Sequence, residues 1–257
     1  MRAFTEWSAA EAARRIAVPA AADDKYSRGV LGVVAGSRRY PGAAVLVVEA
    51  AVRTGLGMVR YLGPELPTLL VLQRRPEVVP DAGRANAWTL GSGMDPADPD
   101  TAARLAAPLS SGLPLVLDAG ALGSWPEATG PVVLTPHHGE AARLLGVERA
   151  SVSADPEAAV LRLAELTGAT VLLKGPVTFV AGGERRIRVS GAPASLATAG
   201  TGDVLAGILG ALLATHPEPE LPELAATAAR LHAEAALRAG SPLAALDLTA
   251  HLPRSAG

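Results

Sequence analysis

A glycine-rich turn that leads directly into an apolar stretch is the part of this sequence best suited to chemistry. Gly200, Thr201 and Gly202 form the turn, and Asp203 follows at once. The start of a helix presents unpaired N–H groups and a partial positive charge, and glycines let an anion approach them closely. A carboxylate in the first turn can take a proton from a hydroxyl that attacks a phosphoryl group held there. The pattern indicates a phosphoryl-transfer site, with Gly200, Thr201 and Gly202 as the anion hole and Asp203 as the general base.

The same turn also has an ordinary explanation, because Thr201 or Asp203 could simply cap the helix. Gly-rich turns before helices are common, so the motif alone does not decide between the two. The stretch Thr201–Ala214 is apolar all round, which predicts a buried helix with no need of a surface cap. Two glycines are also more than a cap requires, so the sequence favours a phosphoryl-transfer site over a simple helix cap.

Three further polar side chains each end or follow an apolar run that is typical of a buried strand. The runs are Leu113–Asp118, Val132–Leu134 and Thr170–Leu173, and the side chains are Asp118, His137 and Lys174. Ligands of parallel α/β sheets bind beyond the carboxyl ends of the strands, so we expect these side chains to share one site. Each has an ordinary alternative: a turn cap for Asp118, a structural hydrogen-bonded His137 and a solvated Lys174.

The rest of the chain alternates short apolar runs with Ala-rich stretches. Further strands are expected at Gly29–Ala35, Met58–Leu62 and Ala87–Leu90, helices at Ala43–Thr54, Glu140–Leu145 and Leu224–Ala239, and surface loops at Asp95–Asp100 and His216–Glu223. Val177–Ala181 and Arg186–Val189 are expected to form an antiparallel pair. The pattern predicts an α/β fold with a mainly parallel central sheet covered by helices on both faces.

Composition excludes several classes of function. The 257 residues fit a single domain, 1–257, and the formal net charge of −2 without a basic run excludes a nucleic-acid partner. The chain has no cysteine, and the adjacent His137 and His138 lack the usual spacing of metal ligands. The sequence has no signal-peptide pattern and no apolar run near the ~20 residues that span a bilayer. We therefore expect a cytoplasmic protein without a membrane partner.

Nine short elements, in this order, resemble one known family. They read KYSRG (25–29), VVAGS (33–37), PGAA (41–44), AVRTGLG (51–57), GSGM (91–94), VLDA (116–119), LTPHHGE (134–140), LLKG (172–175) and ATAGTGDVLAG (197–207). The chain resembles the ADP- or ATP-dependent NAD(P)H-hydrate dehydratases, a branch of the ribokinase-like superfamily. The TPHHGE and RTGLG elements separate this family from the sugar kinases.

The resemblance implies a repair reaction on NADH or NADPH that carries an added water. The hydroxyl is phosphorylated from ADP or ATP, phosphate leaves, and the reduced cofactor is regenerated with the help of Mg²⁺. It also implies a homo-oligomer, with a tetramer as one option. About two dozen residues precede Lys25, which is too few for the epimerase domain that some relatives carry, so we expect a separate epimerase protein as functional partner.

The resemblance assigns roles to particular residues. The nucleotide-binding residues are Lys174, Gly175, Pro176, Val177, Thr178 and Gly202, and the substrate-binding residues are Ala43, Gly93, Asp118, His137 and Asp203. Glu140 is assigned to Mg²⁺ through water, although a negative charge is favoured at this helix start in any case. Ala43 and Gly93 have ordinary turn and packing roles as their alternative.

Several positions depart from the family pattern. Gly120 replaces a second acid, Pro193-Ala194-Ser195 stands where Asn-Pro-Gly is usual, Ala199 replaces a glycine, and Ser92 replaces the proline of a Gly-Pro-Gly turn. Two other functions stay open. One is a small-molecule kinase of the hydroxymethylpyrimidine or hydroxyethylthiazole type, which the TPHHGE element disfavours. The other is a non-catalytic nucleotide-binding relative, which only the departures support.

Overall fold

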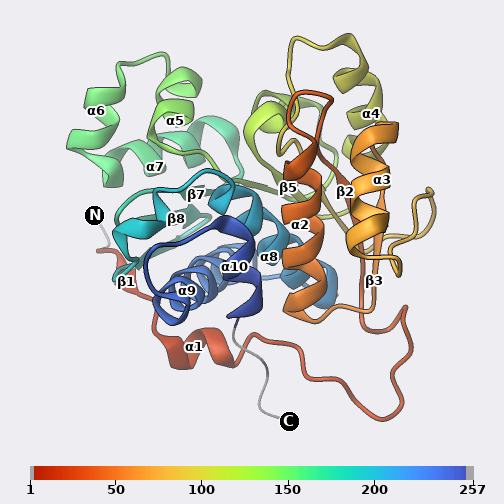
Figure 1. Ribbon diagram of the computed structural model, residues 1–257. Helices are drawn as coiled ribbons and strands as arrows, with labels where there is room; N and C mark the ends of the chain where they lie inside the picture. Colours follow the sequence, from red (N-terminus) through yellow and green to blue (C-terminus); the bar gives the residue numbers. More distant parts are fainter. Residues whose placement is uncertain (1–2, 253–257) are drawn as a thin grey trace.

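A nine-stranded sheet runs through the centre of the protein, whose computed structural model describes residues 3–252 (Figure 1). The strands are β1 (Thr5–Glu6), β2 (Val30–Val34), β3 (Met58–Tyr61), β4 (Ala87–Leu90), β5 (Leu115–Leu117), β6 (Val132–Leu134), β7 (Thr170–Leu173), β8 (Thr178–Gly182) and β9 (Arg185–Val189). Their order across the sheet is β1-β9-β8-β7-β6-β5-β4-β2-β3.

The sheet is mainly parallel, as the alternation of apolar runs and helices predicts. Every neighbouring pair from β3 through β2, β4, β5 and β6 to β7 is parallel. Strands β7, β8 and β9 pair antiparallel, which confirms the expected hairpin, and the short β1 pairs with β9. The carboxyl ends of β4, β5, β6 and β7 therefore lie along one edge of the sheet.

Helices cover both faces of this sheet (Figure 1). One core contains residues of α1 (Ala9–Ala13), α2 (Pro41–Thr54), α3 (Glu65–Arg74), α8 (Thr201–Thr215), α9 (Leu221–Ala239) and α10 (Ala245–Ala250). The other contains residues of α4 (Pro99–Leu109), α5 (His138–Leu145), α6 (Arg149–Ala154) and α7 (Pro156–Thr167). Within β5, Val116 belongs to the first core while Leu115 and Leu117 belong to the second. Both faces are thus buried, which explains why the strands are apolar throughout.

Small residues bring α8 very close to its neighbours. A Cβ added at Gly207 would lie 2.2 Å from the Val47 carbonyl oxygen of α2, and one added at Gly210 would lie 2.0 Å from Thr89 Oγ1 of β4. Because glycine alone fits such contacts, α8 is wedged between α2 and the sheet. This packing fixes the position of the α8 N-terminus.

Some element boundaries differ from the prediction. Helix α2 starts at Pro41 rather than Ala43, since proline suits the first turn of a helix. Helix α9 starts at Leu221, inside the predicted loop His216–Glu223, again with a proline in its first turn. Helix α4 begins within the predicted loop Asp95–Asp100, where the Asp98 carboxylate accepts from the Asp100 N–H. The prediction of loops at Asp95–Asp100 and His216–Glu223 was therefore wrong for the last residues of each segment, which belong to α4 and α9.

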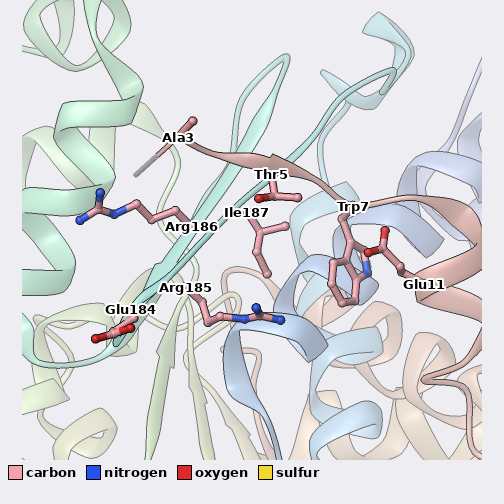
Figure 2. A pocket seen from close by; sticks show the side chains of 8 residues that line it. All are labelled: Ala3, Thr5, Trp7, Glu11, Glu184, Arg185, Arg186 and Ile187. Carbon is pink, nitrogen blue, oxygen red and sulfur yellow. The ribbon is translucent and has the colours of Figure 1, made fainter. Parts of the chain in front are cut away.

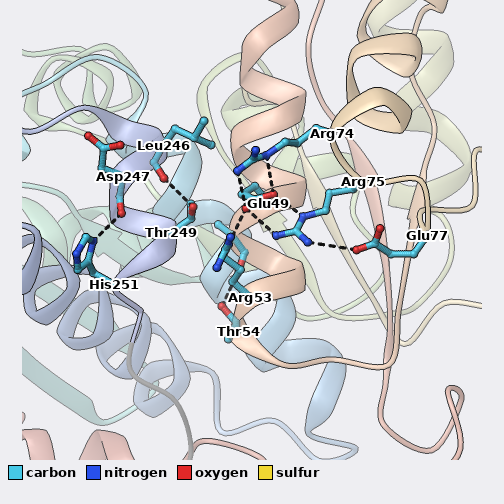
Figure 3. Close-up of polar contacts among 11 residues, drawn as sticks. Glu49, Arg53, Thr54, Arg74, Arg75, Glu77, Leu246, Asp247, Thr249 and His251 are labelled. Carbon is cyan, nitrogen blue, oxygen red and sulfur yellow. Dashed lines mark hydrogen bonds and ion pairs between the residues drawn. The ribbon is translucent and has the colours of Figure 1, made fainter.

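A buried carboxylate joins α2 to α3 and the residue that follows it (Figure 3). Glu49 is fully buried and accepts hydrogen bonds from Arg53 Nε at 2.6 Å, Arg74 Nη2 at 3.2 Å and Arg75 Nη2 at 2.7 Å. Burial would raise the pKa of Glu49, but the hydrogen bonds from Arg75, Arg53 and Arg74 outweigh it and lower the pKa to about 2. The cluster is a structural ion-pair network away from the strand ends.

Within residues 3–252, none of the helices combines the length and the apolar composition needed to cross a membrane.

Candidate active site

Asp118 is the centre of a buried polar network at the carboxyl ends of the parallel strands. The residue follows β5 and is 3% exposed. Its Oδ1 accepts from Thr135 Oγ1 at 2.7 Å and from Lys174 Nζ at 2.8 Å, and its Oδ2 accepts from Ser92 Oγ at 2.9 Å. Thr135 follows β6, Lys174 follows β7 and Ser92 follows β4, so the strand ends converge as expected. The Asp118 side chain makes no capping hydrogen bond to the following turn, which rules out its ordinary alternative.

Lys174 connects this network to the start of α8. A Cβ added at Gly202 would lie 3.5 Å from Lys174 Nζ, so the ammonium group stands beside the glycine-rich turn. Burial would lower the pKa of Lys174, but the charge of Asp118, followed by that of Glu140, raises it overall. Burial would likewise raise the pKa of Asp118, whereas Lys174 and the two hydroxyls lower it. The pair is therefore charged, and Lys174 is not a solvated surface lysine.

The N-terminus of α8 has no side-chain cap, so the capping explanation of Thr201 and Asp203 was wrong. Gly200 occupies the N-cap position with a φ of +89°, a backbone conformation that favours glycine. Thr201 Oγ1 instead donates to the carbonyl oxygens of Leu196 at 2.8 Å and Thr198 at 2.9 Å. The Thr201 N–H donates to the Thr198 carbonyl oxygen at 3.4 Å. The N–H groups of Gly202 and Asp203 in this first turn have no helical partner and can bind an anion.

Asp203 lies in the first turn of α8, close to the Asp118 network. Burial and the negative charge of Asp118 raise the pKa of Asp203 to about 7, while Lys174 and a hydrogen bond with Ser92 act in the opposite direction. A carboxylate with such a pKa is ionised in part at neutral pH and can accept a proton readily. This property is the one expected of a general base.

His137 and Glu140 form a reciprocal cap on α5. His137 Nδ1 accepts from the N–H groups of Gly139 at 3.0 Å and Glu140 at 3.1 Å, and the Glu140 carboxylate accepts from the His137 N–H at 2.8 Å. The His137 side chain is 55% exposed, and its Nε2 lies 3.6 Å from Glu140 Oε1. Among residues 3–252, no group of three or more His, Cys, Asp or Glu side chains is arranged to hold a metal ion.

The turn between β7 and β8 lies against the loop that carries His137. The Lys174 N–H donates to the Pro136 carbonyl oxygen at 2.8 Å, and Lys174 also forms a parallel bridge with His137. A Cβ added at Gly175 would lie 2.8 Å from His138 Nε2. The turn continues through Pro176 and Val177 to Thr178, which starts β8. The residues assigned to the nucleotide and His137 are thus neighbours.

Ala43 and Gly93 meet on the other side of the strand ends. Gly93 has a φ of +67°, and a Cβ added there would lie 2.4 Å from Ala43 Cβ. Ala43 belongs to the first turn of α2, so this contact places the N-terminus of α2 beside the turn that holds Ser92. This contact agrees with the alternative in which both residues serve packing. The substrate-binding role of Ala43 and Gly93 stays a prediction.

Sequence reasoning missed three buried polar residues around this site. Ser92 and Thr135 donate to Asp118, and the Nε2 of His232 on α9 has no hydrogen-bond partner among the described residues. Burial lowers the pKa of His232 to about 4, while a backbone hydrogen bond with Thr201 has the opposite effect. Ser92 and Thr135 each follow a strand and lie within two of the elements that resemble the family, GSGM and LTPHHGE. That position could have identified them. His232 sits within an Ala-rich helix and gives no such signal.

A pocket of about 360 Å³ lies elsewhere, at the edge formed by β1 and β9 (Figure 2). Thr5 and Ile187 are paired across these strands, and Arg185 starts β9. Since β9 runs in the same direction as β7, this pocket is near the amino ends of the parallel strands. It is therefore separate from Asp118 and Lys174.

Solved structures identify the class of fold. A ribokinase-like superfamily protein from Enterococcus faecalis matches with a TM-score of 0.85 at 23% identity, covering 97% of this chain and 94% of that one. The hydroxyethylthiazole kinase of Pyrococcus horikoshii matches with a TM-score of 0.65 at 17% identity, covering 94% and 90%. The fold is therefore ribokinase-like.

The family follows from closer relatives. The family model described as NAD(P)H-hydrate dehydratase matches residues 31–254, so the chain belongs to the NAD(P)H-hydrate dehydratase family. The ADP/ATP-dependent NAD(P)H-hydrate dehydratase of Bacillus subtilis, co-crystallised with ATP and Mg²⁺, is similar with a TM-score of 0.89 at 26% identity, covering 98% of this chain and 97% of that one.

Curated relatives give a consistent result. The bifunctional NAD(P)H-hydrate repair enzyme of Mycobacterium tuberculosis is 45% identical over 81% of this chain and 46% of its own length. The chain thus spans less than half of that relative. The ADP-dependent (S)-NAD(P)H-hydrate dehydratase of Neisseria meningitidis is 39% identical over 72% of this chain and 69% of its own length.

Proposed function

We propose that this protein dehydrates hydrated NADH and NADPH, restoring the reduced cofactors with ADP or ATP as the phosphoryl donor. The observation that carries the proposal is the meeting of Asp203, Lys174 and Asp118 at the N-terminus of α8, in a chain of the NAD(P)H-hydrate dehydratase family. The names of the Neisseria and Bacillus relatives support both the reaction and the nucleotide.

The reaction has two steps that these residues can serve. Asp203 removes the proton of the substrate hydroxyl while that oxygen bonds to the terminal phosphorus of the nucleotide, and the phosphorus–oxygen bond to the shortened nucleotide breaks. The first-turn N–H groups of α8 and the Lys174 ammonium stabilise the charge on the transferred group. The ring carbon–oxygen bond then breaks, phosphate leaves, and loss of a ring proton restores the double bond.

Asp118 acts on this site through Lys174. Its carboxylate holds Lys174 Nζ at 2.8 Å, which directs the ammonium toward Gly202. The turn from Gly175 to Thr178 would contact the nucleotide, and the exposed edge of His137 would contact the hydrated nicotinamide. Ala43 and Gly93 would border the substrate where the α2 N-terminus meets the strand ends.

Mg²⁺ fits the chemistry of the site without a dedicated protein cage. The ion usually keeps several waters and binds one or two carboxylates together with substrate phosphates. The buried Glu140 carboxylate faces Lys174 and would hold the ion through water. When bound, Mg²⁺ would neutralise phosphate charge. A cytoplasmic location and a homo-oligomeric state belong to the same proposal.

The second candidate is a kinase that releases a stable phosphorylated product. The ribokinase-like fold is shared with the hydroxyethylthiazole kinase of Pyrococcus horikoshii, so the fold allows this function. Product analysis separates the two functions, because a dehydratase yields free phosphate and reduced cofactor whereas a kinase yields a phosphoester.

Asp203→Asn tests the assignment of the general base. The amide cannot accept the proton, so we expect turnover to fall by roughly 10²–10⁴-fold, the range typical of general-base removal, while nucleotide binding is kept. The comparison is between kcat of the variant and of the wild type on hydrated NADH, with nucleotide affinity measured by calorimetry. Turnover within a few-fold of the wild type would rule out Asp203 as the base.

A further inference from the structure

The loop between β2 and α2, residues 35–40, carries two adjacent arginines, Arg38 and Arg39, followed by Tyr40. It lies at the carboxyl end of β2, above α2 in Figure 1. All three side chains are exposed, and Arg39 lies 5.2 Å from the centre of the Tyr40 ring. Neither guanidinium has an ion pair or a side-chain hydrogen bond within residues 3–252. The loop thus presents two positive charges that no described carboxylate neutralises.

This loop is fixed against the turn that carries Ser92. The Gly36 N–H donates to the Ser92 carbonyl oxygen at 2.7 Å. A Cβ added at Gly93 would lie 3.0 Å from the Tyr40 carbonyl oxygen, so the loop and the turn are in close contact. Ser92 Oγ in turn donates to Asp118 at 2.9 Å. The loop therefore borders the polar network at the strand ends.

The loop also leads into the helix that flanks the proposed general base. Helix α2 begins directly after Tyr40. A Cβ added at Gly200 would lie 2.6 Å from Leu46 Cδ1 of α2 and 4.0 Å from Asp203 Oδ2. The two arginines are therefore at the border of the candidate active site, next to Ala43, which we expect to contact the substrate.

The order of the strands separates this loop from the residues proposed to bind the donor nucleotide. Lys174 and the turn after it follow β7, whereas the loop follows β2, with β6, β5 and β4 between them. At about 4.8 Å between neighbouring strands, these four steps correspond to roughly 19 Å. An anion bound by the loop therefore belongs to the other substrate. Hydrated NADH and hydrated NADPH share a diphosphate, and hydrated NADPH has a further phosphate on its adenosine ribose.

We propose that Arg38 and Arg39 bind a phosphate group of the hydrated dinucleotide. A guanidinium presents N–H donors in a planar fork that matches the oxygens of a phosphate. Two adjacent positive charges repel each other, and a phosphate beside them offsets this repulsion. The whole chain has a formal net charge of −2, so the pair is a local basic site that attracts an anionic substrate. The proposal rests on the proposed function, in which the hydrated cofactors are the substrates.

The test is a double variant, Arg38→Gln with Arg39→Gln, assayed with hydrated NADH and with hydrated NADPH. Because charge-assisted hydrogen bonds to phosphate are lost, we expect KM for at least one dinucleotide to rise roughly tenfold to hundredfold. The value of kcat and the KM for the donor nucleotide should change little, since both arginines lie away from the nucleotide turn.

Arg162→Gln is the matched control for the loss of charge. Arg162 is exposed on α7, which packs on β7 and β8 rather than on the loop, so its KM values should equal those of the wild type. A rise in KM for hydrated NADPH alone assigns the arginines to the ribose phosphate, and an equal rise for both dinucleotides assigns them to the diphosphate. Unchanged KM values for both, the same rise in Arg162→Gln, or a rise for the donor nucleotide in their place overturns the proposal.

Calorimetric binding of NADH and NADPH gives the same comparison without turnover. If the wild type converts neither hydrated cofactor, the proposed function fails, and calorimetry alone decides the role of the arginines. Weaker binding of either reduced cofactor by the double variant then supports the phosphate site. Equal binding by the wild type and the variant, or no binding by the wild type, overturns it.

Discussion

The surroundings that raise the pKa of Asp203, and so suit it to the proposed role of general base, also lower the stability of the folded protein when Asp203 is ionised. Its pKa of about 7 in the folded state exceeds the usual 3.8, because burial and the charge of Asp118 disfavour the ionised form. Between pH 3.8 and pH 7 the folded state binds more protons at this residue than the unfolded state does. The contribution of Asp203 to stability is therefore lost as the pH rises through this window.

Asp203→Asn should accordingly stabilise the protein at pH 8, by on the order of 2 kcal/mol, and have little effect at pH 4. Thermal unfolding at the two pH values measures the difference. Asp118→Asn is the matched control. Lys174 lowers the pKa of Asp118 although Asp118 is buried. Loss of the Asp118 charge leaves the Lys174 ammonium without its ion-pair partner, so this variant should lower the melting temperature at pH 8. Equal effects of the two variants would contradict the account.

At this scale the sequence predicts which residue types meet but not how they are paired. Asp118, His137 and Lys174 each follow an apolar run, and they do converge at the strand ends. The ion pair of Asp118 with Lys174 depends on the spacing of β5 and β7 in the sheet, which no local pattern contains. The cap that His137 forms on α5 depends on the orientation of its ring, which no local sequence pattern contains either.

At the scale of elements, the site depends on how closely α8 approaches α2. An alanine at Gly207 would bring its Cβ to 2.2 Å from the Val47 carbonyl oxygen, so the two helices would have to separate. The first turn of α8, with the proposed anion hole, would move with them. The apolar run Thr201–Ala214 predicts a buried helix correctly, but the identity of its partner comes from tertiary packing alone.

Gly207→Ala should destabilise the fold by about 2 kcal/mol through overpacking, with urea unfolding as the measurement. Gly42→Ala in α2 is the matched control, because nothing lies within 4 Å of its added Cβ. That substitution should be neutral or slightly stabilising, since alanine favours a helix more than glycine does. A Gly207→Ala variant as stable as Gly42→Ala would show that α8 has room to move.

At the scale of the whole molecule, the order of apolar runs and helices predicts the parallel sheet, its two covered faces and the antiparallel hairpin. The sequence did not predict β1, which pairs with β9 across nearly the whole length of the chain. Two residues are too few for a periodic pattern, and their pairing partner lies at Ile187 and Arg188. Likewise, α9 extends into a segment whose prolines suggested a loop, because proline is also favoured in the first turn of a helix.

We propose removal of water from a hydrated nicotinamide at this site, rather than formation of a stable phosphoester. Its most direct test is to incubate the protein with hydrated NADH, Mg²⁺ and either ADP or ATP, and to follow the absorbance of reduced nicotinamide together with free phosphate. We expect both to rise in equal amounts with at least one nucleotide, and the nucleotide that supports the reaction is the donor. Nucleotide binding without recovery of NADH, or a phosphorylated nicotinamide product that persists, would contradict it.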